Sequence, residues 1–152
     1  MTVSASSPGR ERQKGQIKVS ATVRNFIDEE RAAMGELPRD RVRAVTIRRM
    51  LVDTGALHLA LPADIVAALG LRMTREMRVN TAAGPATMRF FTGVGLEVSG
   101  RSSVFSCLEL PVGTVPLLGA IPMEELGLQP DLMNQTLILL PEEGPDNFHL
   151  MY

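Results

Sequence analysis

The sequence predicts a mainly β fold, with a closed or barrel-like sheet and one or two short helices. Apolar and polar residues alternate over several short runs, as they do in strands that bury one face. Turns rich in glycine and proline separate these runs, and the chain of 152 residues holds 13 glycines and 10 prolines. Many short strands joined by such turns are typical of barrels and sandwiches. Aromatic residues make up only 4% of the chain, so we expect an aliphatic core.

The expected strands follow one another through most of the chain. They cover residues 17–23, 45–52, 57–62, 77–81, 87–91, 94–98, 104–108 and 137–140. In the first strand, Ile, Val and Ala alternate with Lys, Ser, Thr and Arg. In the second strand we expect Val45, Ile47 and Leu51 to share the buried face. Turn-forming residues at 82–85 and 99–102 are predicted to connect four of the strands into two hairpins.

Short helices are expected at a few places between the strands. One helix is predicted over residues 63–69, with Pro62 near its start and Gly70 as its C-terminal stop. The connector of residues 25–35 is expected to hold a helical turn. Two acidic residues, Glu124 and Glu125, are expected on the solvated face of a later short helix.

Length, charge and cysteine content bound the domain organisation and the function. We place one domain at residues 16–140, preceded by a polar and disordered segment at 1–15 and followed by a C-terminal tail at 141–152. With a formal net charge of −1, the chain lacks the excess of basic residues that is typical of nucleic-acid-binding proteins. No apolar run reaches the roughly 20 residues that span a membrane, and the polar start does not resemble a secretory signal. The single cysteine, Cys107, excludes an intramolecular disulfide, so we expect a reduced, cytoplasmic setting.

The motif Asp53-Thr54-Gly55 stands at the end of an apolar strand and is followed by Ala56. This arrangement resembles the catalytic loop of aspartic proteases. Further along, Leu117-Leu118-Gly119 resembles their second signature, in which two apolar residues and a glycine precede a short helix. The resemblance covers residues 16–140 and is closest to small, single-lobed, bacterial retropepsin-like proteases, in which a pair such as Asn134-Gln135 also recurs.

The resemblance implies a homodimer, because the chain carries one such aspartate and the chemistry needs two carboxylates that share a proton. Two copies of Asp53 would meet on a two-fold axis. One would act as base on a water, and the other would polarise the scissile carbonyl of a peptide or protein substrate. No cofactor or metal is implied. Thr54 would hydrogen-bond the partner's loop, while Gly55 and Gly119 would allow a tight turn and close packing.

The turn Ala82-Ala83-Gly84-Pro85 is implied to be the tip of a flap that closes over the bound peptide. Gly84 would supply flexibility, and the small tip residues would approach the substrate backbone, which is gripped as an added strand. Met88 and Phe90 are candidate walls of a substrate pocket. Strand position alone does not tell which face of the sheet they line.

Several alternatives stay open at this point. Asp-Thr-Gly is also an ordinary strand-ending turn. A catalytically weak or inactive dimer of the same fold could bind a peptide or serve assembly, and a monomer would leave Asp53 without a partner. Two departures from the family pattern support weak activity: Leu57 stands where many relatives have Ser or Thr, and Ala120 where retroviral enzymes often have Arg.

The remaining candidates have ordinary explanations beside the functional ones. His58 either tunes a substrate pocket or is a surface histidine. Cys107 is expected to be a small buried hydrophobe rather than a nucleophile. The edges of the strands at 17–23 and 137–140 are expected to join the two copies through backbone pairing.

Overall fold

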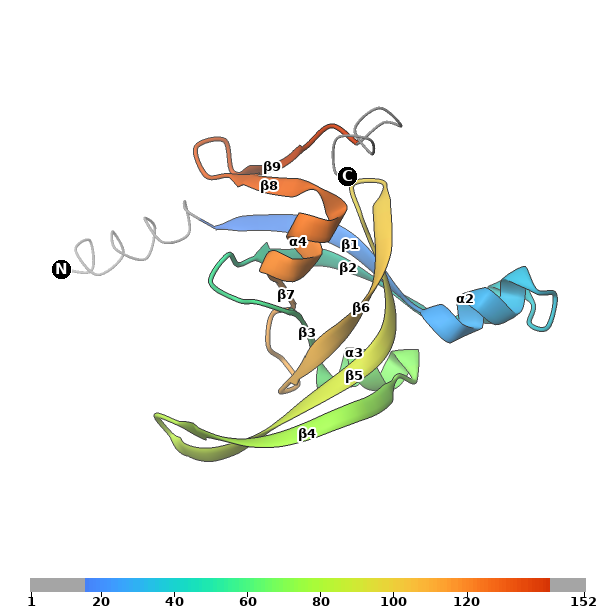
Figure 1. Ribbon diagram of the computed structural model, residues 1–152, viewed down its shortest axis with the longest axis horizontal. Coiled ribbons are helices and arrows are strands. Elements are labelled where there is room, and N and C mark those ends of the chain that lie inside the picture. The colour runs from blue at the N-terminus through green and yellow to red at the C-terminus, as the bar shows by residue number, and fades with distance from the viewer. Residues whose placement is uncertain (1–15, 143–152) are drawn as a thin grey trace, which may run out of the picture.

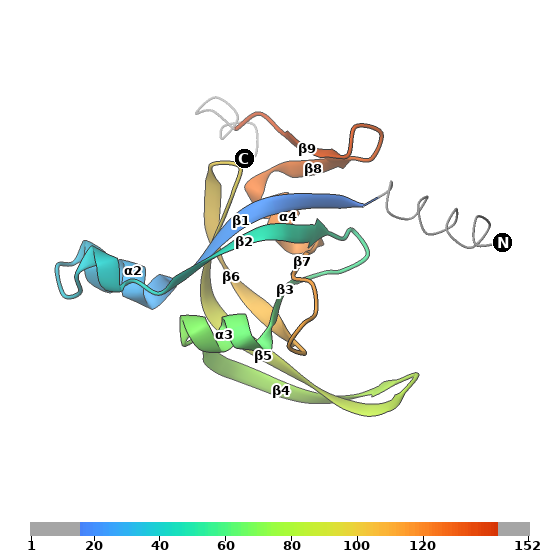
Figure 2. The same ribbon diagram turned by 180° about the vertical axis from the view of Figure 1, so that it is seen from behind.

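The computed structural model describes residues 16–142, and strands are its main elements (Figures 1 and 2). The strands are β1 (Ile17–Asn25), β2 (Ala44–Val52), β3 (Leu59–Pro62), β4 (Arg72–Thr81), β5 (Gly84–Val98), β6 (Arg101–Leu110), β7 (Leu117–Leu118), β8 (Leu128–Asp131) and β9 (Thr136–Leu139). The helices are α2 (Phe26–Ala33), α3 (Ala63–Leu69) and α4 (Ala120–Leu126), with a 3-10 turn at Arg39–Arg41. The mainly β prediction is confirmed. Within these residues there are three helices rather than one or two, because the connector after β1 forms a helix of eight residues.

Six strands close into a barrel. Their hydrogen-bonded order is β1-β2-β7-β3-β6-β5, and residues 22–25 of β1 pair with residues 94–97 of β5 to complete the ring. β4 lies outside this ring and pairs only with β5. The expected closed sheet is therefore present, and β4 and β5 extend from it as a two-stranded arm (Figure 1).

The register between β1 and β2 shifts halfway along the pair. Met50 lies opposite Val19, whereas Ile47 lies opposite Ala21, so β2 carries one extra residue between the two pairs. Such a bulge lets Ile47 and Met50, three residues apart, both point into the core. Leu51, which was expected on the same face as Ile47, is only half-buried.

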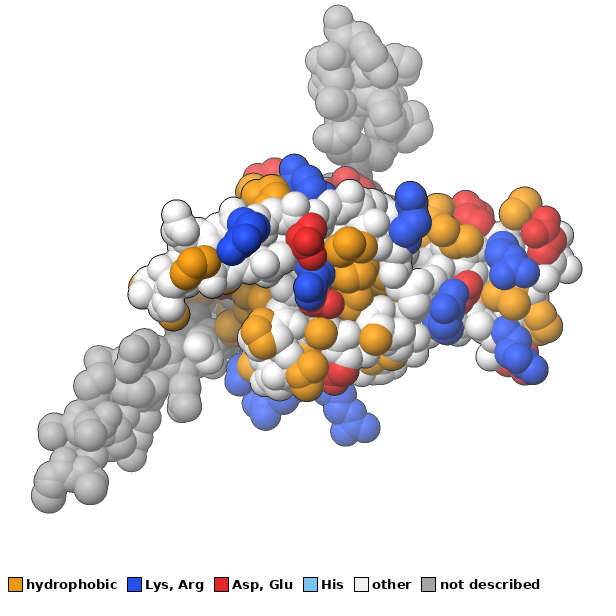
Figure 3. Space-filling view, turned by 90° about the horizontal axis from the view of Figure 1, so that it is seen from below, with side chains coloured by type: hydrophobic (Ala, Val, Ile, Leu, Met, Phe, Trp, Pro, Cys, Tyr) orange, Lys and Arg blue, Asp and Glu red, His pale blue; other side chains and the backbone are white. Residues whose placement is uncertain are grey.

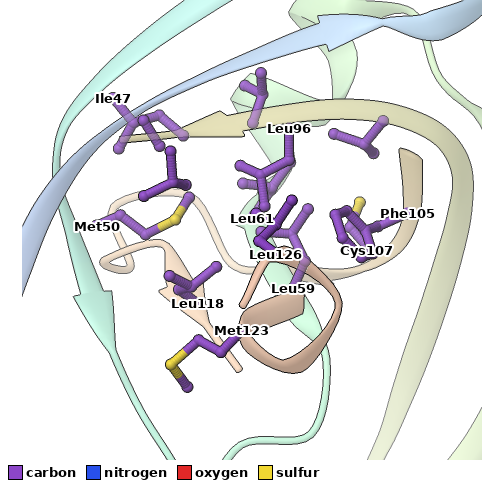
Figure 4. Packing of buried hydrophobic residues seen from close by; sticks show 14 of the residues in the cluster. Ile47, Met50, Leu59, Leu61, Leu96, Phe105, Cys107, Leu118, Met123 and Leu126 are labelled. Carbon is purple, nitrogen blue, oxygen red and sulfur yellow. The ribbon is translucent and has the colours of Figure 1, made fainter. Parts of the chain in front are cut away.

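The core inside the ring is mostly aliphatic, and Figure 4 shows its side chains meeting from facing strands and from α4. They include Ile47, Met50, Leu59, Leu61, Leu96, Phe105, Cys107, Leu118, Met123 and Leu126. Burial raises the pKa of the Cys107 thiol to about 12, and the negative charge of Glu109 adds to this effect. Cys107 is therefore a protonated, buried hydrophobe, as predicted, since the thiolate is the nucleophilic form.

A buried polar group anchors α2 at one end of the barrel. The Asn25 side chain accepts a hydrogen bond from the Asp28 backbone N–H at 2.9 Å and donates one to the Leu69 carbonyl at 2.8 Å. The Asp28 carboxylate accepts three hydrogen bonds from Arg43, from the backbone N–H, Nε and Nη2, at 3.0, 2.8 and 3.1 Å. These contacts hold the pKa of Asp28 below its usual range. Beyond this anchor, α2 projects away from the barrel (Figures 1 and 2).

The C-terminal part forms a separate hairpin of β8 and β9. The sequence predicted β9 but not β8, which pairs with it from Leu128 opposite Leu139 to Asp131 opposite Thr136. In the turn, the Asp131 carboxylate accepts a hydrogen bond from the Asn134 side chain at 2.7 Å. This contact lowers the pKa of Asp131.

The open edges differ from those expected for residues 17–23. Because residues 22–25 pair with β5, only residues 17–21 of β1 leave an unpaired edge beside the hairpin. Within the described residues, β9 pairs with β8 alone and keeps its other edge open. The expected disorder at 1–15 and most of the expected tail, residues 143–152, lie outside the described residues.

The surface mixes charges of both signs. Figure 3 views the molecule from below, where basic and acidic side chains are interspersed with hydrophobic ones. Glu124 and Glu125 are exposed, as predicted for a solvated helix face. None of the helices in residues 16–142 is long and apolar enough to cross a membrane.

Candidate active site

Asp53 directly follows β2, and backbone hydrogen bonds to the second signature fix its position. The Leu51 N–H donates to the Pro116 carbonyl at 2.9 Å, and the Asp53 N–H donates to the Leu118 carbonyl at 3.0 Å. β7 pairs in parallel with β2 on one side and antiparallel with β3 on the other. The second signature therefore lies between the two strands that lead into and out of the Asp-Thr-Gly loop.

The loop itself turns tightly around the carboxylate. The Ala56 N–H donates to the Asp53 carbonyl at 3.1 Å, and the Gly55 N–H donates to Asp53 Oδ1 at 2.9 Å. A Cβ at Gly55 would lie only 3.3 Å from the same Oδ1. Glycine at this position therefore lets the backbone approach and orient the carboxylate, which stays partly exposed. Thr54 is exposed at the tip of the loop.

Gly119 is required by the close approach of the second signature to this loop. A Cβ at Gly119 would lie 2.8 Å from the Ala56 carbonyl oxygen, and it would also collide with backbone atoms of His58. The first N–H groups of α4 face the same loop: Ala120 donates to the Ala56 carbonyl at 2.9 Å, and Ile121 donates to the Leu57 carbonyl at 3.0 Å. Helix starts leave such donors without intrahelical partners, and here the Asp-Thr-Gly loop accepts from them.

The carboxylate opens into a cavity of about 520 Å³ between the loop and the C-terminal hairpin. Its lining consists of Ile17, Val52, Asp53, Thr54, Gln129, Pro130 and Leu132. Among the described residues, Asp53 is the only charged side chain in this lining. Within residues 16–142, Asp53 has no ion-pair partner.

Exposed apolar side chains lie in the cavity lining, directly after the Asp-Thr-Gly motif and at the start of α4. Leu132, which lines the cavity, is 63% exposed, and Leu57, in the loop itself, is 58% exposed. Ile121, hydrogen-bonded through its backbone to Leu57, is exposed as well. Exposed apolar side chains of this size are suited to contact with a partner.

The predicted flap is a hairpin, with β4 and β5 joined at the tip by Ala82 and Ala83. Gly84 adopts a φ of +116°, a conformation that favours glycine. The Thr81 hydroxyl accepts a hydrogen bond from the Ala83 N–H at 3.2 Å and donates one to the Gly84 carbonyl at 2.7 Å. Pro85 lies opposite Asn80, in the part of β5 that precedes Phe90, the first residue of this strand that pairs with β6. The tip is exposed and does not line the Asp53 cavity.

The chain belongs to the aspartyl protease family. The family's model matches residues 41–131, which run from the start of β2, through the loop, the arm and the second signature, to the end of β8. A search of curated proteins finds no match. The resemblance that Asp53-Thr54-Gly55 and Leu117-Leu118-Gly119 indicated is thus confirmed at the level of the family.

The structure brings the two predicted signatures together and adds residues that the sequence did not single out. Ile17, Gln129 and Leu132 line the cavity beside Asp53, although they are distant from it in sequence. Ile17 is near the loop because it pairs with Val52, whereas Gln129 and Leu132 reach it through the packing of a separate hairpin. Thr81, at the arm tip, could have been suspected from the turn preference of threonine hydroxyls. Among the described residues, no group of three His, Cys, Asp or Glu side chains is arranged to hold a metal ion.

Proposed function

We propose that the chain is an aspartic endopeptidase whose active site forms across a homodimer. The observation that carries the proposal is the single carboxylate in a cavity that has no second acidic group in its lining. Aspartic protease chemistry needs two carboxylates sharing one proton, so a second copy must supply the other. The exposed Leu57 and Leu132 support an interface at this opening. In a two-fold dimer the same surface meets itself, and both copies of Asp53 lie at the axis.

In this proposal the two Asp53 carboxylates have different roles at any one moment. Like charges about 3 Å apart cannot both persist, so the pair keeps one proton. The charged carboxylate takes a proton from the attacking water, and the protonated one donates to the carbonyl oxygen of the peptide bond. The proton taken from the water then passes to the leaving nitrogen as the C–N bond breaks, and a hydroxyl of the tetrahedral intermediate returns its proton to the other carboxylate, so the pair again holds one proton. The Gly55 N–H bond to Oδ1 orients each carboxylate before the substrate arrives.

The arm of β4 and β5 would serve as the flap over an extended peptide. Among the described residues, the strand residues of the outer arm, 76–81 and 84–89, pair only with one another, so the tip can move without breaking the barrel. Closing over the substrate excludes water from the carboxylates. The unpaired backbone edges at residues 17–21 and on β9 would contribute to the dimer, and Thr54 would reach the partner's loop. We also keep the cytoplasmic setting as a prediction from the single cysteine.

The proposal is tested with purified Asp53→Asn, which keeps the shape of the side chain but cannot act as the base. Hydrolysis of a peptide that the wild type cleaves should fall by several orders of magnitude, with an unchanged circular dichroism spectrum. Cleavage at the wild-type rate would contradict the catalytic role of Asp53.

A mixing experiment tests the two-chain site. Wild-type and Asp53→Asn chains are combined at fixed total concentration and allowed to exchange, and mixed dimers lack one carboxylate. Activity should fall as the square of the wild-type fraction. Specific activity should also fall on dilution as sedimentation shows dissociation. A linear dependence on the wild-type fraction, or a fully active monomer, would contradict the shared site. A stable dimer without any hydrolysis would favour the alternative, a peptide-binding or assembly module.

A further inference from the structure

A second apolar surface lies on the outer side of the barrel wall, away from the core. Ala60 and Phe90 are both buried, yet neither packs in the core cluster. Strand pairing explains their position: Ala60 lies opposite Leu108, Leu108 opposite Phe90, and Phe90 opposite Arg75. Residues directly opposite in paired strands share one face, so this row crosses β3, β6, β5 and β4 on the face turned away from the core. Phe90 therefore lines the outer face of the barrel wall.

Phe90 is the centre of a stack of three side chains on this face. The His58 ring meets the Phe90 ring edge-on, with centroids 5.4 Å apart and planes at 81°. The Arg75 guanidinium lies over the same ring, 4.6 Å from its centroid. His58 belongs to the segment that follows the Asp-Thr-Gly loop, and Arg75 belongs to the arm. The stack therefore joins the catalytic loop to the base of the proposed flap.

Arg75 carries a charge that the nearby acids do not neutralise. Glu76 and Glu109 both pair with Arg89, at 2.8 and 3.3 Å. Arg89 precedes Phe90, and Glu76 follows Arg75. Because side chains alternate along a strand, Arg89 and Glu76 point to the opposite face of the sheet. Within residues 16–142, Arg75 makes no ion pair. A guanidinium stacked on an aromatic ring keeps its N–H edge free for a carboxylate.

We propose that Arg75, supported by Phe90 and flanked by His58, forms a subsite for an acidic side chain of the peptide substrate. This inference rests on the proposed function, because it concerns a substrate position beside the same catalytic loop. The aromatic ring holds the guanidinium in place before binding, which reduces the ordering cost of the contact. An extended peptide under the arm would present alternate side chains to this face, and one of them would reach Arg75.

The test compares peptides that carry either Glu or Gln at a single position and are otherwise identical. Each position around the scissile bond of a cleaved peptide is varied between Glu and Gln. At one position, the wild type should cleave the Glu peptide with a kcat/KM about tenfold or more above that for the Gln peptide. This is the difference expected for one hydrogen bond to a charged group. In Arg75→Met this Glu-to-Gln ratio should collapse toward one, and in Arg75→Glu the same position should favour Lys over Glu.

Arg78→Met is the matched control, because Arg78 lies three residues along the same strand, opposite Thr87, and points to the other face. It removes the same charge from the arm and should keep the wild-type ratio. If Arg78→Met lowers the ratio as much as Arg75→Met, the effect is general electrostatics and the subsite is wrong. A wild type with no preference for Glu at any position also overturns it.

Calorimetry of Asp53→Asn with both peptides separates this proposal from the catalytic one. Tighter binding of the Glu peptide, lost in the Asp53→Asn/Arg75→Met double variant, supports the subsite even without turnover. Equal or absent binding of the two peptides overturns the subsite, whereas absent hydrolysis by the wild type alone would count only against the proposed protease activity.

Discussion

The loop that carries Asp53 and the arm that would close over it are held in opposite ways. Three backbone hydrogen bonds join the loop to residues 118–121, and two strands of the barrel, β2 and β3, flank it. In the outer arm, residues 76–81 and 84–89, the strands pair only with each other among the described residues, and most of this length is exposed. The difference shows where this chain requires fixed geometry and where it allows movement.

In the proposed function, the two regions have different tasks, and these tasks explain the difference. Two carboxylates that share a proton must meet within a few tenths of an ångström, so their loops need rigid support. A peptide must enter and leave, so the cover above them has to open. Regions with few buried contacts and exposed backbone bonds open at low free-energy cost. A substitution that displaces the loop should therefore lower activity far more than a substitution at the arm tip.

Among the variants that test this contrast between loop and arm, Gly119→Ala should have the largest effect. The new Cβ would collide with backbone atoms of Ala56 and His58, which cannot move aside as a flexible side chain would. Displacing the loop by even part of an ångström should lower kcat/KM by about a hundredfold. The free energy of unfolding should fall by about 1–3 kcal/mol, as for overpacking, measured by urea denaturation.

Gly35→Ala serves as the control for this variant. Gly35 lies after α2 with a φ of +77° and open space around its Cβ position, so the substitution causes strain of about 1–2 kcal/mol without any collision. Its catalytic rate should stay at the wild-type level. A Gly119→Ala enzyme as active as Gly35→Ala would show that the close contact of the two signatures does not set the catalytic geometry.

The two signatures were readable in the sequence because each is local. Asp53-Thr54-Gly55 and Leu117-Leu118-Gly119 need specific residue types at adjacent positions, and glycine is needed where backbones come into contact. Helix α3 was equally readable from Pro62 and from Gly70, which adopts a left-handed φ of +62° at the helix end. Patterns of this kind depend on short-range geometry, which the residue types themselves dictate.

The missed features depend on pairing between distant segments. The bulge in β2 buries Met50 instead of Leu51, and alternation alone cannot reveal an inserted residue. β8 is only four residues long and contains Pro130, which argues against a strand in a sequence-based assignment. The stack of Arg75 on Phe90 requires the register of β4 against β5, which a one-residue slip would abolish.

An intermediate effect, on stability alone, is expected for Asp28→Asn at the α2 anchor. The amide leaves the hydrogen bonds of Arg43 poorly satisfied, which should cost about 1–3 kcal/mol of unfolding free energy. kcat/KM at neutral pH should stay unchanged, because the anchor does not touch the catalytic loop. Glu97→Gln, which breaks a partly exposed ion pair with Arg24, should cost at most about 1 kcal/mol.

The Asp28 contribution also has a defined pH dependence. Arg43 lowers the folded-state pKa of Asp28 below its ordinary value of 3.8, so the unfolded chain takes up the proton first as pH falls. The stabilisation is therefore complete well above pH 3.8 and is lost as the pH falls through the folded pKa. The stability gap between wild type and Asp28→Asn should narrow over this acidic range. A gap that stays constant down to the acid transition would contradict the ion pair as its source.

The smallest effect is expected for Thr81→Val at the arm tip. Valine keeps the branched shape suited to a strand but removes the hydroxyl that bonds Ala83 and Gly84. The turn should loosen, with faster hydrogen exchange at the Ala83 amide and a KM raised by up to about threefold, the size expected for one weak exposed hydrogen bond.

Thr87→Val is the matched control, because Thr87 is an exposed threonine of the same arm whose side chain makes no hydrogen bond within the described residues. Since the arm lies outside the barrel ring, neither variant should change the urea midpoint by more than the error of measurement. A large loss of global stability in Thr81→Val would show that arm and barrel unfold as one unit, and the contrast between a fixed loop and a movable cover would then be wrong.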